Sequence, residues 1–189
     1  MTLVAGVILV QLVSRGQPET GAAGETKIKM KNEVNSNSTR IGNLSANVPD
    51  TWTGIRPSSS MRLMEFRLGV AADDATLAIF KNIGGTIDNN LERWSGQFGY
   101  SLSDSEVNIR AENINGMQVS IISILGTYTN TMAFSDATQP KPNYRLLGAI
   151  ADTPDGLYYF KLTGPNTVIT GRLEEFTLFI QSLRYDKIG

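Results

Sequence analysis

The chain has 189 residues, a formal net charge of −1 at pH 7, no cysteine and no histidine. That length suits a single domain with a sizeable core. The nearly neutral, dispersed charge offers no basic surface, so we expect no nucleic-acid partner. Without His or Cys there is no Ser-His or Cys-His dyad, no disulfide and no ordinary zinc or haem ligand set, and we predict no metal and no cofactor.

The N-terminal forty residues differ in composition from the rest of the chain. Residues 3–13 form an apolar run interrupted by Gln11, which is typical of a signal peptide and too short to span a bilayer as a helix. We predict a signal peptide or N-terminal hydrophobic segment at 1–23 and a flexible, polar linker at 24–40. The alternative is that residues 3–13 form a buried helix or strand. The prediction places the protein in the periplasm or outside the cell, with membrane contact through the N-terminal segment as a further option.

A single α+β domain is predicted at 41–185, and its first part reads as strands. Residues 44–48 alternate in polarity and favour a short strand, which a loop through Trp52 follows. Residues 61–68 and 76–83 are apolar enough to pair as a hairpin, whose tip holds Asp73 and Asp74.

A helix and a second hairpin follow. Thr86 is a suitable N-cap, and apolar residues then recur at helical spacing. The residues of this stripe are Ile87, Leu91, Trp94 and Phe98. Asn115-Gly116, between apolar runs at 107–114 and 117–128, is the strongest short signal for a tight hairpin turn. We interpret residues 129–142, which contain two prolines, as a surface loop.

The C-terminal quarter predicts a third hairpin and a long amphipathic helix. Residues 144–152 and 157–163 read as strands around a turn at Pro154 and Gly156. The helix should start after Pro165 and cover the sheet with one apolar stripe. Its residues are Ile169, Leu173, Phe176, Ile180 and Leu183.

The predicted order is β-β-β-α-β-β-β-β-α. Hairpins with two helices, without regular alternation of strand and helix, favour a mainly antiparallel sheet of about six to seven strands covered by two helices.

Four stretches carry a resemblance to known proteins. They are PSSSMRLMEFRL at 57–68, NNLERWSGQF at 89–98, GTYT at 126–129 and NYRLLGAIADTPDGLYYFKLTGP at 143–165. These stretches resemble a group of uncharacterised bacterial envelope proteins, often predicted lipoproteins, although this chain has no cysteine to carry a lipid. The element order is similar to that of the PsbP extrinsic proteins of photosystem II and the Ran-binding Mog proteins. The resemblance implies a PsbP-like fold, an envelope location and no catalytic residues.

Polar and amphipathic residues within otherwise apolar segments form the candidate binding face, because interfaces favour Arg and Tyr. They are Arg62, Arg93, Gln97, Tyr128, Tyr144, Arg145 and Lys161. Arg93 and Gln97 are expected on an exposed helix face. Tyr144 and Arg145 are neighbours in a strand, so they cannot face the same side.

The sequence therefore predicts a non-enzymatic, exported binding or accessory domain that recognises a protein or small ligand in the envelope. The alternative is a metal-independent hydrolase that uses two facing carboxylates. Its candidate residues are Glu65, Glu92, Asp73 and Asp74.

Overall fold

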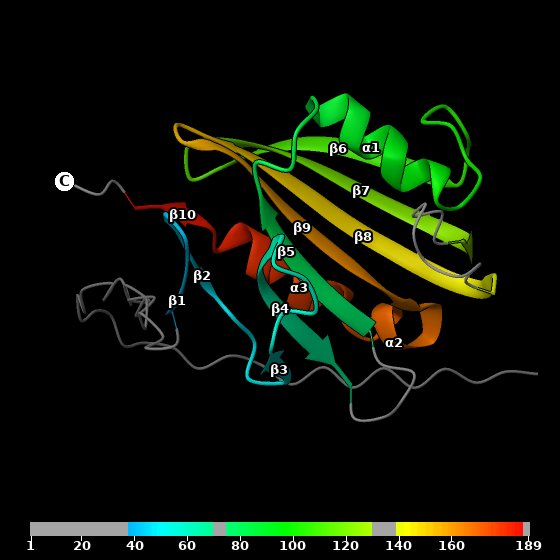
Figure 1. The fold of residues 1–189 in the computed structure, drawn as a ribbon, viewed down its shortest axis with the longest axis horizontal. Helices are drawn as coiled ribbons and strands as arrows, with labels where there is room; N and C mark the ends of the chain where they lie inside the picture. The colour runs from blue at the N-terminus through cyan, green and yellow to red at the C-terminus, as the bar shows by residue number, and fades with distance from the viewer. Residues whose placement is uncertain (1–37, 70–74, 130–138, 187–189) are drawn as a thin grey trace, which may run out of the picture. The chain divides into compact units, whose positions relative to one another are not determined.

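The computed structural model describes residues 38–69, 75–129 and 139–186. Its main element is a seven-stranded antiparallel sheet with strand order β3-β4-β5-β9-β8-β7-β6 (Figure 1). The strands are β3 (Trp52–Ile55), β4 (Arg62–Leu68), β5 (Ala75–Lys81), β6 (Val107–Ile114), β7 (Met117–Tyr128), β8 (Lys141–Thr153) and β9 (Gly156–Pro165). This topology confirms the predicted α+β class with a mainly antiparallel sheet.

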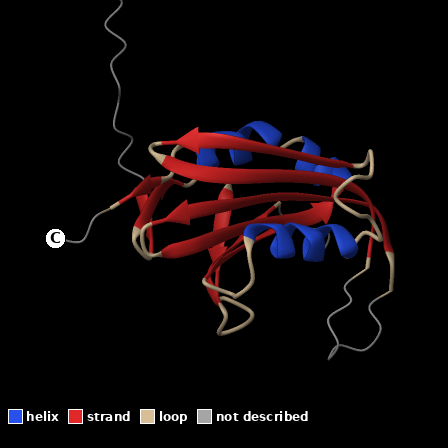
Figure 2. Cartoon of the chain, turned by 90° about the horizontal axis from the view of Figure 1, so that it is seen from above, coloured by secondary structure: helices blue, strands red, loops and turns tan. Residues whose placement is uncertain are grey.

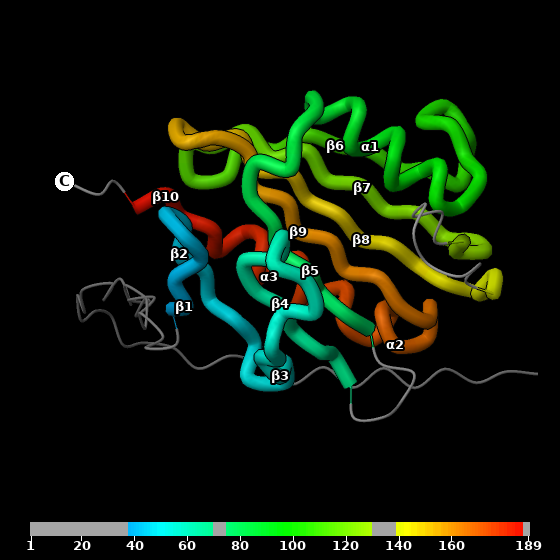
Figure 3. Tube along the Cα trace, viewed as in Figure 1, coloured from blue at the N-terminus to red at the C-terminus, as the bar shows by residue number. Residues whose placement is uncertain are grey.

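A second sheet has three short strands in the order β1-β2-β10. They are β1 (Ser38–Ile41), β2 (Leu44–Asn47) and β10 (Arg184–Tyr185). Figure 3 shows β2 and β10 side by side, although they come from opposite ends of the domain, and Arg184 pairs with Ser45. The small sheet therefore ties the beginning of the described chain to its end.

Turn and cap residues act where the sequence predicts them. Asn115 and Gly116 both have positive φ, 49° and 87°, as a tight hairpin turn between β6 and β7 requires. Thr86 caps α1 (Ile87–Gly96) by accepting a hydrogen bond from the Asn89 backbone N–H, and Asn89 Oδ1 accepts one from the Thr86 backbone N–H. Both predictions are confirmed.

The large sheet packs on both of its faces (Figure 2). On one face, α1 packs against β7, β8 and β9 through Leu91, Trp94 and Phe98. On the other face, the core contains residues of α2 (Asn166–Thr170), α3 (Leu173–Gln181) and the small sheet, among them Ile41 and Phe179. Neighbouring residues of β9 pack on opposite faces of the sheet. Tyr159 belongs to the core beneath α1, whereas Phe160 belongs to the core on the α3 face.

Helix α1 lies close to the sheet because Gly148 has no side chain. A Cβ atom at Gly148 would lie 2.4 Å from Trp94 Cζ3 and 2.8 Å from Ile122 Cγ2. Trp94 is only 3% exposed and meets the Tyr159 ring edge-on at a centroid distance of 6.5 Å. Core packing of Trp94, as predicted, is confirmed.

The predicted single C-terminal helix is wrong, because the chain breaks it between α2 and α3. Gly171 ends α2, and Arg172 leaves helical geometry with φ −121°. At the break, Leu173 is 37% exposed, whereas the other four residues of the predicted stripe are buried as predicted: Ile169, Phe176, Ile180 and Leu183. The period alone could not show this, because Gly171 was compatible with a continuous helix.

Three predicted loop or linker boundaries also need correction. Residues 38–40 belong to β1, not to the linker, because Gly42 with φ 62° turns the chain so that β1 pairs with β2. Residues 52–55 form the edge strand β3, held by the buried Trp52, and not a loop. Lys141 and Pro142 belong to β8, since Lys141 pairs with Tyr128. Residues 1–37 and 130–138, and the hairpin tip at Asp73 and Asp74, lie outside the described residues.

No helix in the described part of the chain combines the length and apolar character needed to cross a bilayer.

The broken helix predicts unequal effects for two neighbouring apolar residues. Phe176→Ala should lower the free energy of unfolding by about 3–5 kcal/mol, because it empties a buried site. Leu173→Ala should lower it by less than about 1 kcal/mol, because Leu173 is partly exposed. Urea unfolding measures both. Equal losses would show that a continuous helix buries both residues.

Gly148→Ala should destabilise the domain by about 1–3 kcal/mol, because the new methyl group cannot fit beneath Trp94. Gly96→Ala is the matched control. Gly96 ends α1 with open space around its Cα, so alanine there should be neutral or stabilise by up to about 1 kcal/mol. Thermal unfolding of the two variants distinguishes them, and an unchanged midpoint for Gly148→Ala would contradict the close packing of α1.

Candidate functional site

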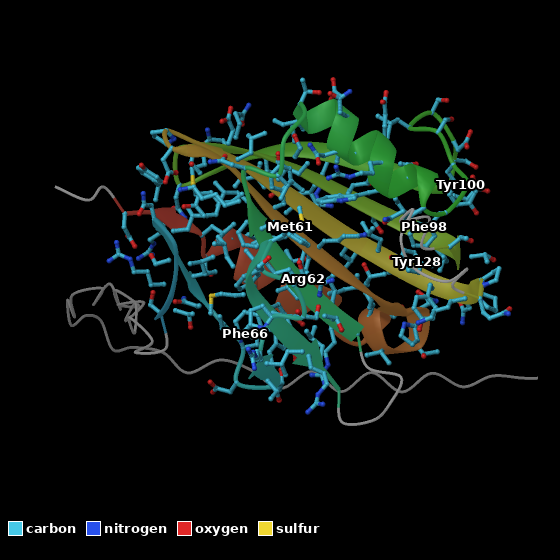
Figure 4. All side chains as sticks on the ribbon, in the orientation of Figure 1. Met61, Arg62, Phe66, Phe98, Tyr100 and Tyr128 are labelled. Atoms are coloured by element: carbon cyan, nitrogen blue, oxygen red, sulfur yellow. The ribbon has the colours of Figure 1, made fainter. Side chains whose placement is uncertain are left out.

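A groove of about 350 Å³ lies on the α1 face of the large sheet, beside the C-terminal end of α1. Its lining comes from β4, β5, β7, β8, β9 and the residue that caps α1, Gln97. Figure 4 shows Phe98 and Tyr128 together near this end of α1, with Arg62 on β4 across from them. The groove thus brings together segments that are far apart in the sequence.

Strand register explains the floor of the groove. Glu65, Ala78, Lys161 and Gly148 pair in one row across β4, β5, β9 and β8. Trp94 covers Gly148, whereas Ala78 on the opposite side of Lys161 lines the groove. Because Ala78 contributes only a methyl group, it leaves space between the larger side chains of the row.

Lys161 lies in the middle of this floor and is partly buried. Its Nζ donates a hydrogen bond to Gln97 Oε1 and lies 5.7 Å from the centroid of the Tyr128 ring. Burial, followed by repulsion from Arg93 and Arg62, lowers the pKa of Lys161 to about 7. At neutral pH, therefore, the amine exchanges between its charged and neutral forms.

Arg62 and Glu65 form an ion pair at the β4 side of the groove, with Nη1 and Oε1 2.6 Å apart. The Ser58 backbone N–H also donates to Glu65 Oε2, at 2.8 Å. Burial by itself raises the pKa of Glu65, but these hydrogen bonds and the Arg62 charge outweigh it, so the net pKa is lowered. Glu65 is therefore an ionised partner of Arg62 and is poorly suited to donate a proton.

Aromatic rings form the opposite wall. The rings of Tyr128 and Tyr144 are stacked, with an interplanar angle of 12° and centroids 6.0 Å apart. Phe98 supports Tyr128 from the α1 side at 5.4 Å, and Lys141 Nζ lies 5.3 Å from the Tyr144 ring centroid. Burial raises the pKa of Tyr128, so its hydroxyl stays protonated near neutral pH.

The groove gathers five of the seven predicted binding residues: Arg62, Gln97, Tyr128, Tyr144 and Lys161. Gln97 was expected on an exposed helix face, but it is only 5% exposed, because it turns toward Lys161. Arg93 is exposed beside the groove and donates a hydrogen bond to Asn90 Oδ1.

Arg145 lies on the opposite face of the sheet from Tyr144. Its Nε donates to Asn166 Oδ1 at 2.8 Å, and its Nη1 donates to Ser123 Oγ at 3.1 Å. Strand alternation predicts this separation, and these contacts join β8 to β7 and α2.

Sequence reasoning missed several groove residues. Thr76, Ala78 and Phe80 alternate along β5, Thr163 follows Lys161 on β9, and Lys141 starts β8. Alternation in steps of two would have found Thr163 from Lys161, but the β5 residues required the pairing of β5 with β9.

Of the four carboxylates proposed for a hydrolase, Asp73 and Asp74 lie outside the described residues, and the other two do not lie together. Glu65 lines the groove, whereas Glu92 is exposed on α1 and is not among the lining residues. Among the described residues, no group of three or more acidic side chains is placed to hold a metal ion.

Comparison with known proteins finds likeness among solved structures. No protein-family model matches the chain, and no curated protein matches it. The structure is similar to the solution structure of cyanobacterial PsbP (CyanoP) from Synechocystis sp. PCC 6803, with a TM-score of 0.48, 13% identity, and coverage of 76% of this chain and 86% of that chain. A likeness at this level transfers no ligand, partner or location, and the likeness to bacterial envelope proteins stays a prediction.

Lys161 should make stability depend on pH in a characteristic window. Its pKa is about 7 in the folded protein, against an ordinary 10.5, so between these values the unfolded chain binds more protons. The free energy of unfolding should therefore rise from pH 7 to 9, by up to about 1.4 kcal/mol per pH unit from this group. Urea unfolding at several pH values measures the slope. Lys161→Met should remove this contribution, while Lys141→Met, at an exposed lysine, should keep it; identical slopes in wild type and Lys161→Met would contradict the assignment.

Proposed function

We propose that this chain is a non-enzymatic binding or accessory domain, and that its binding site is the groove beside the C-terminal end of α1. The observation that carries the proposal is the convergence of Arg62, Lys161, Tyr128 and Tyr144 on one cavity from four different strands. Its volume, about 350 Å³, lies within the range of small-ligand pockets, about 300–1,000 Å³. Arg and Tyr are also the residues that recognition surfaces favour.

The chemistry of the groove supports binding better than hydrolysis. A glycosidase-type mechanism needs two carboxyl groups on either side of the scissile bond, one of them protonated. Glu65 is the sole carboxylate among the described residues that line the groove, and its ion pair with Arg62 keeps it ionised. The hydrolase hypothesis therefore has no supporting pair of residues in the described structure.

The proposed setting is the cell envelope, with a protein or small ligand as the partner. This part rests on the apolar run at 3–13 and on the likeness of the four quoted stretches to envelope proteins. It is independent of the groove.

Site-directed photo-crosslinking in cells tests the proposal for either kind of partner. A diazirine amino acid replaces Thr163, which lines the groove and is not part of the Arg62–Glu65 or Lys161–Gln97 contacts. The matched control replaces Glu174, which is exposed on α3. We expect a discrete product, a protein adduct or a defined mass increase, at position 163 and background at 174.

Equal yields at the two positions, or no product at 163, would overturn the groove as the binding site. The same cells, fractionated before irradiation, report where the protein resides. Recovery of the chain solely with the cytosol would remove the envelope from the proposal and leave the groove to be judged by its crosslinks.

A further inference from the structure

The groove has an excess of positive charge. Arg62 and Glu65 neutralise each other, which leaves Lys161 and Lys141. Within the described residues neither lysine contacts a carboxylate: Lys161 meets the Gln97 amide and the Tyr128 ring, and Lys141 meets the Tyr144 ring. A desolvated ammonium group is costly unless it is paired, and the described residues of the groove supply no counter-charge to Lys161, so a ligand can supply it.

Resting on the proposed function, we propose that the groove binds a small organic monoanion, a carboxylate attached to a flat apolar body. The carboxylate pairs with the Lys161 ammonium group above Ala78, and the flat body lies along Tyr128 and Tyr144. Nothing in this assignment requires a reaction at the bound molecule.

The charges and the aromatic wall of the groove favour an organic carboxylate over a phosphate. Lys141 is exposed at the start of β8, so Lys161 is the cation that a bound anion neutralises in the floor of the groove. One charge neutralises Lys161, whereas a second would have to be desolvated beside the Glu65 carboxylate of the same row. The aromatic wall adds an apolar surface that inorganic anions cannot use. The Tyr128 and Tyr144 rings are nearly parallel, with an interplanar angle of 12°, so a planar group can pack along both of them.

Binding should depend on protonation of Lys161. An anion prefers the ammonium form, and that form is only partly populated near neutral pH because the pKa is about 7. Guanidinium groups stay charged, Glu65 stays ionised with its lowered pKa, and Tyr128 stays neutral with its raised pKa. The charged and titratable groups that face Lys161 or line its groove are Arg62 and Glu65 on β4, Arg93 on α1, Tyr128 on β7, and Lys141 and Tyr144 on β8.

Titration with benzoate, its neutral isostere benzamide and inorganic phosphate tests the proposal, with affinities measured by NMR at pH 6 and pH 8. Benzoate should bind at pH 6 and at least about tenfold more tightly than benzamide or phosphate. If the ligand selects the protonated form, a pKa of about 7 makes that form about nine-tenths populated at pH 6 and about one-tenth at pH 8. Benzoate affinity should therefore fall about tenfold between the two pH values.

Variants separate the charge of Lys161 from its shape. Lys161→Arg keeps a cation that does not titrate, so benzoate should bind with less than about twofold change from pH 6 to pH 8. Lys161→Met should lose benzoate binding at both pH values. Tyr144→Ala should weaken benzoate and leave acetate unchanged. Arg184→Gln, at an exposed arginine on β10 outside the groove, should behave as wild type.

Equal binding of benzoate and benzamide, pH-independent binding in wild type, or no benzoate binding at all would overturn the ligand class. So would tighter binding of phosphate than of benzoate. Circular dichroism at both pH values shows whether each variant is folded. If Lys161→Met does not fold, Lys161→Arg is the decisive variant. A crosslink at position 163 without benzoate binding would refute this inference and keep the proposed function, whereas the loss of both would refute both.

Discussion

The contact of Trp94 with Gly148 sets the position of α1 and, through it, the geometry of the groove. Gly148 permits the indole to lie against the backbone of β8, where a Cβ atom would be 2.4 Å from Trp94 Cζ3. Gly148 also pairs with Lys161 on β9. Because Gln97 follows Trp94 by three residues, and thus lies on the same side of α1, the helix that covers Gly148 also brings Gln97 to Lys161. The close contact between Trp94 and Gly148 therefore determines that Gln97 is the residue that hydrogen-bonds to the Lys161 amine.

On the opposite face of the large sheet, different contacts stabilise the same strands. Trp52 on β3 packs on Phe179 at a centroid distance of 5.0 Å, and its Nε1 donates to Glu175 Oε2 at 2.8 Å. Phe160 meets Phe179 from β9, with the rings 5.7 Å apart. Since Phe160 and Lys161 are consecutive, burial of Phe160 against α3 forces the Lys161 side chain to the groove face. Packing of Phe160 in the core on one face of the sheet thus determines that Lys161 lies on the other face.

Local signals in the sequence predicted most of the sheet, whereas contacts between distant segments account for the groove residues that were missed. Asn115-Gly116 and Thr86 act through their immediate neighbours, so their roles could be read directly. Strand alternation likewise separated Tyr144 from Arg145. The strand at Trp52 was missed because the Glu175 side chain, which accepts a hydrogen bond from the Trp52 indole, is distant in the sequence. The groove residues of β5 were missed for the same reason.

The groove exists because α1 covers only part of this face of the large sheet. Helix α1 covers β7, β8 and part of β9, while β5 and β4 continue beyond it on the same face. Lys161 lies at this boundary, in a row with covered Gly148 on one side and groove-lining Ala78 on the other. A lysine fully beneath the helix would need a buried partner, and one further out would be solvated like an ordinary surface lysine. At the boundary the amine is desolvated by protein on one side and open to a ligand on the other, which is the position that a binding site for a charged molecule requires.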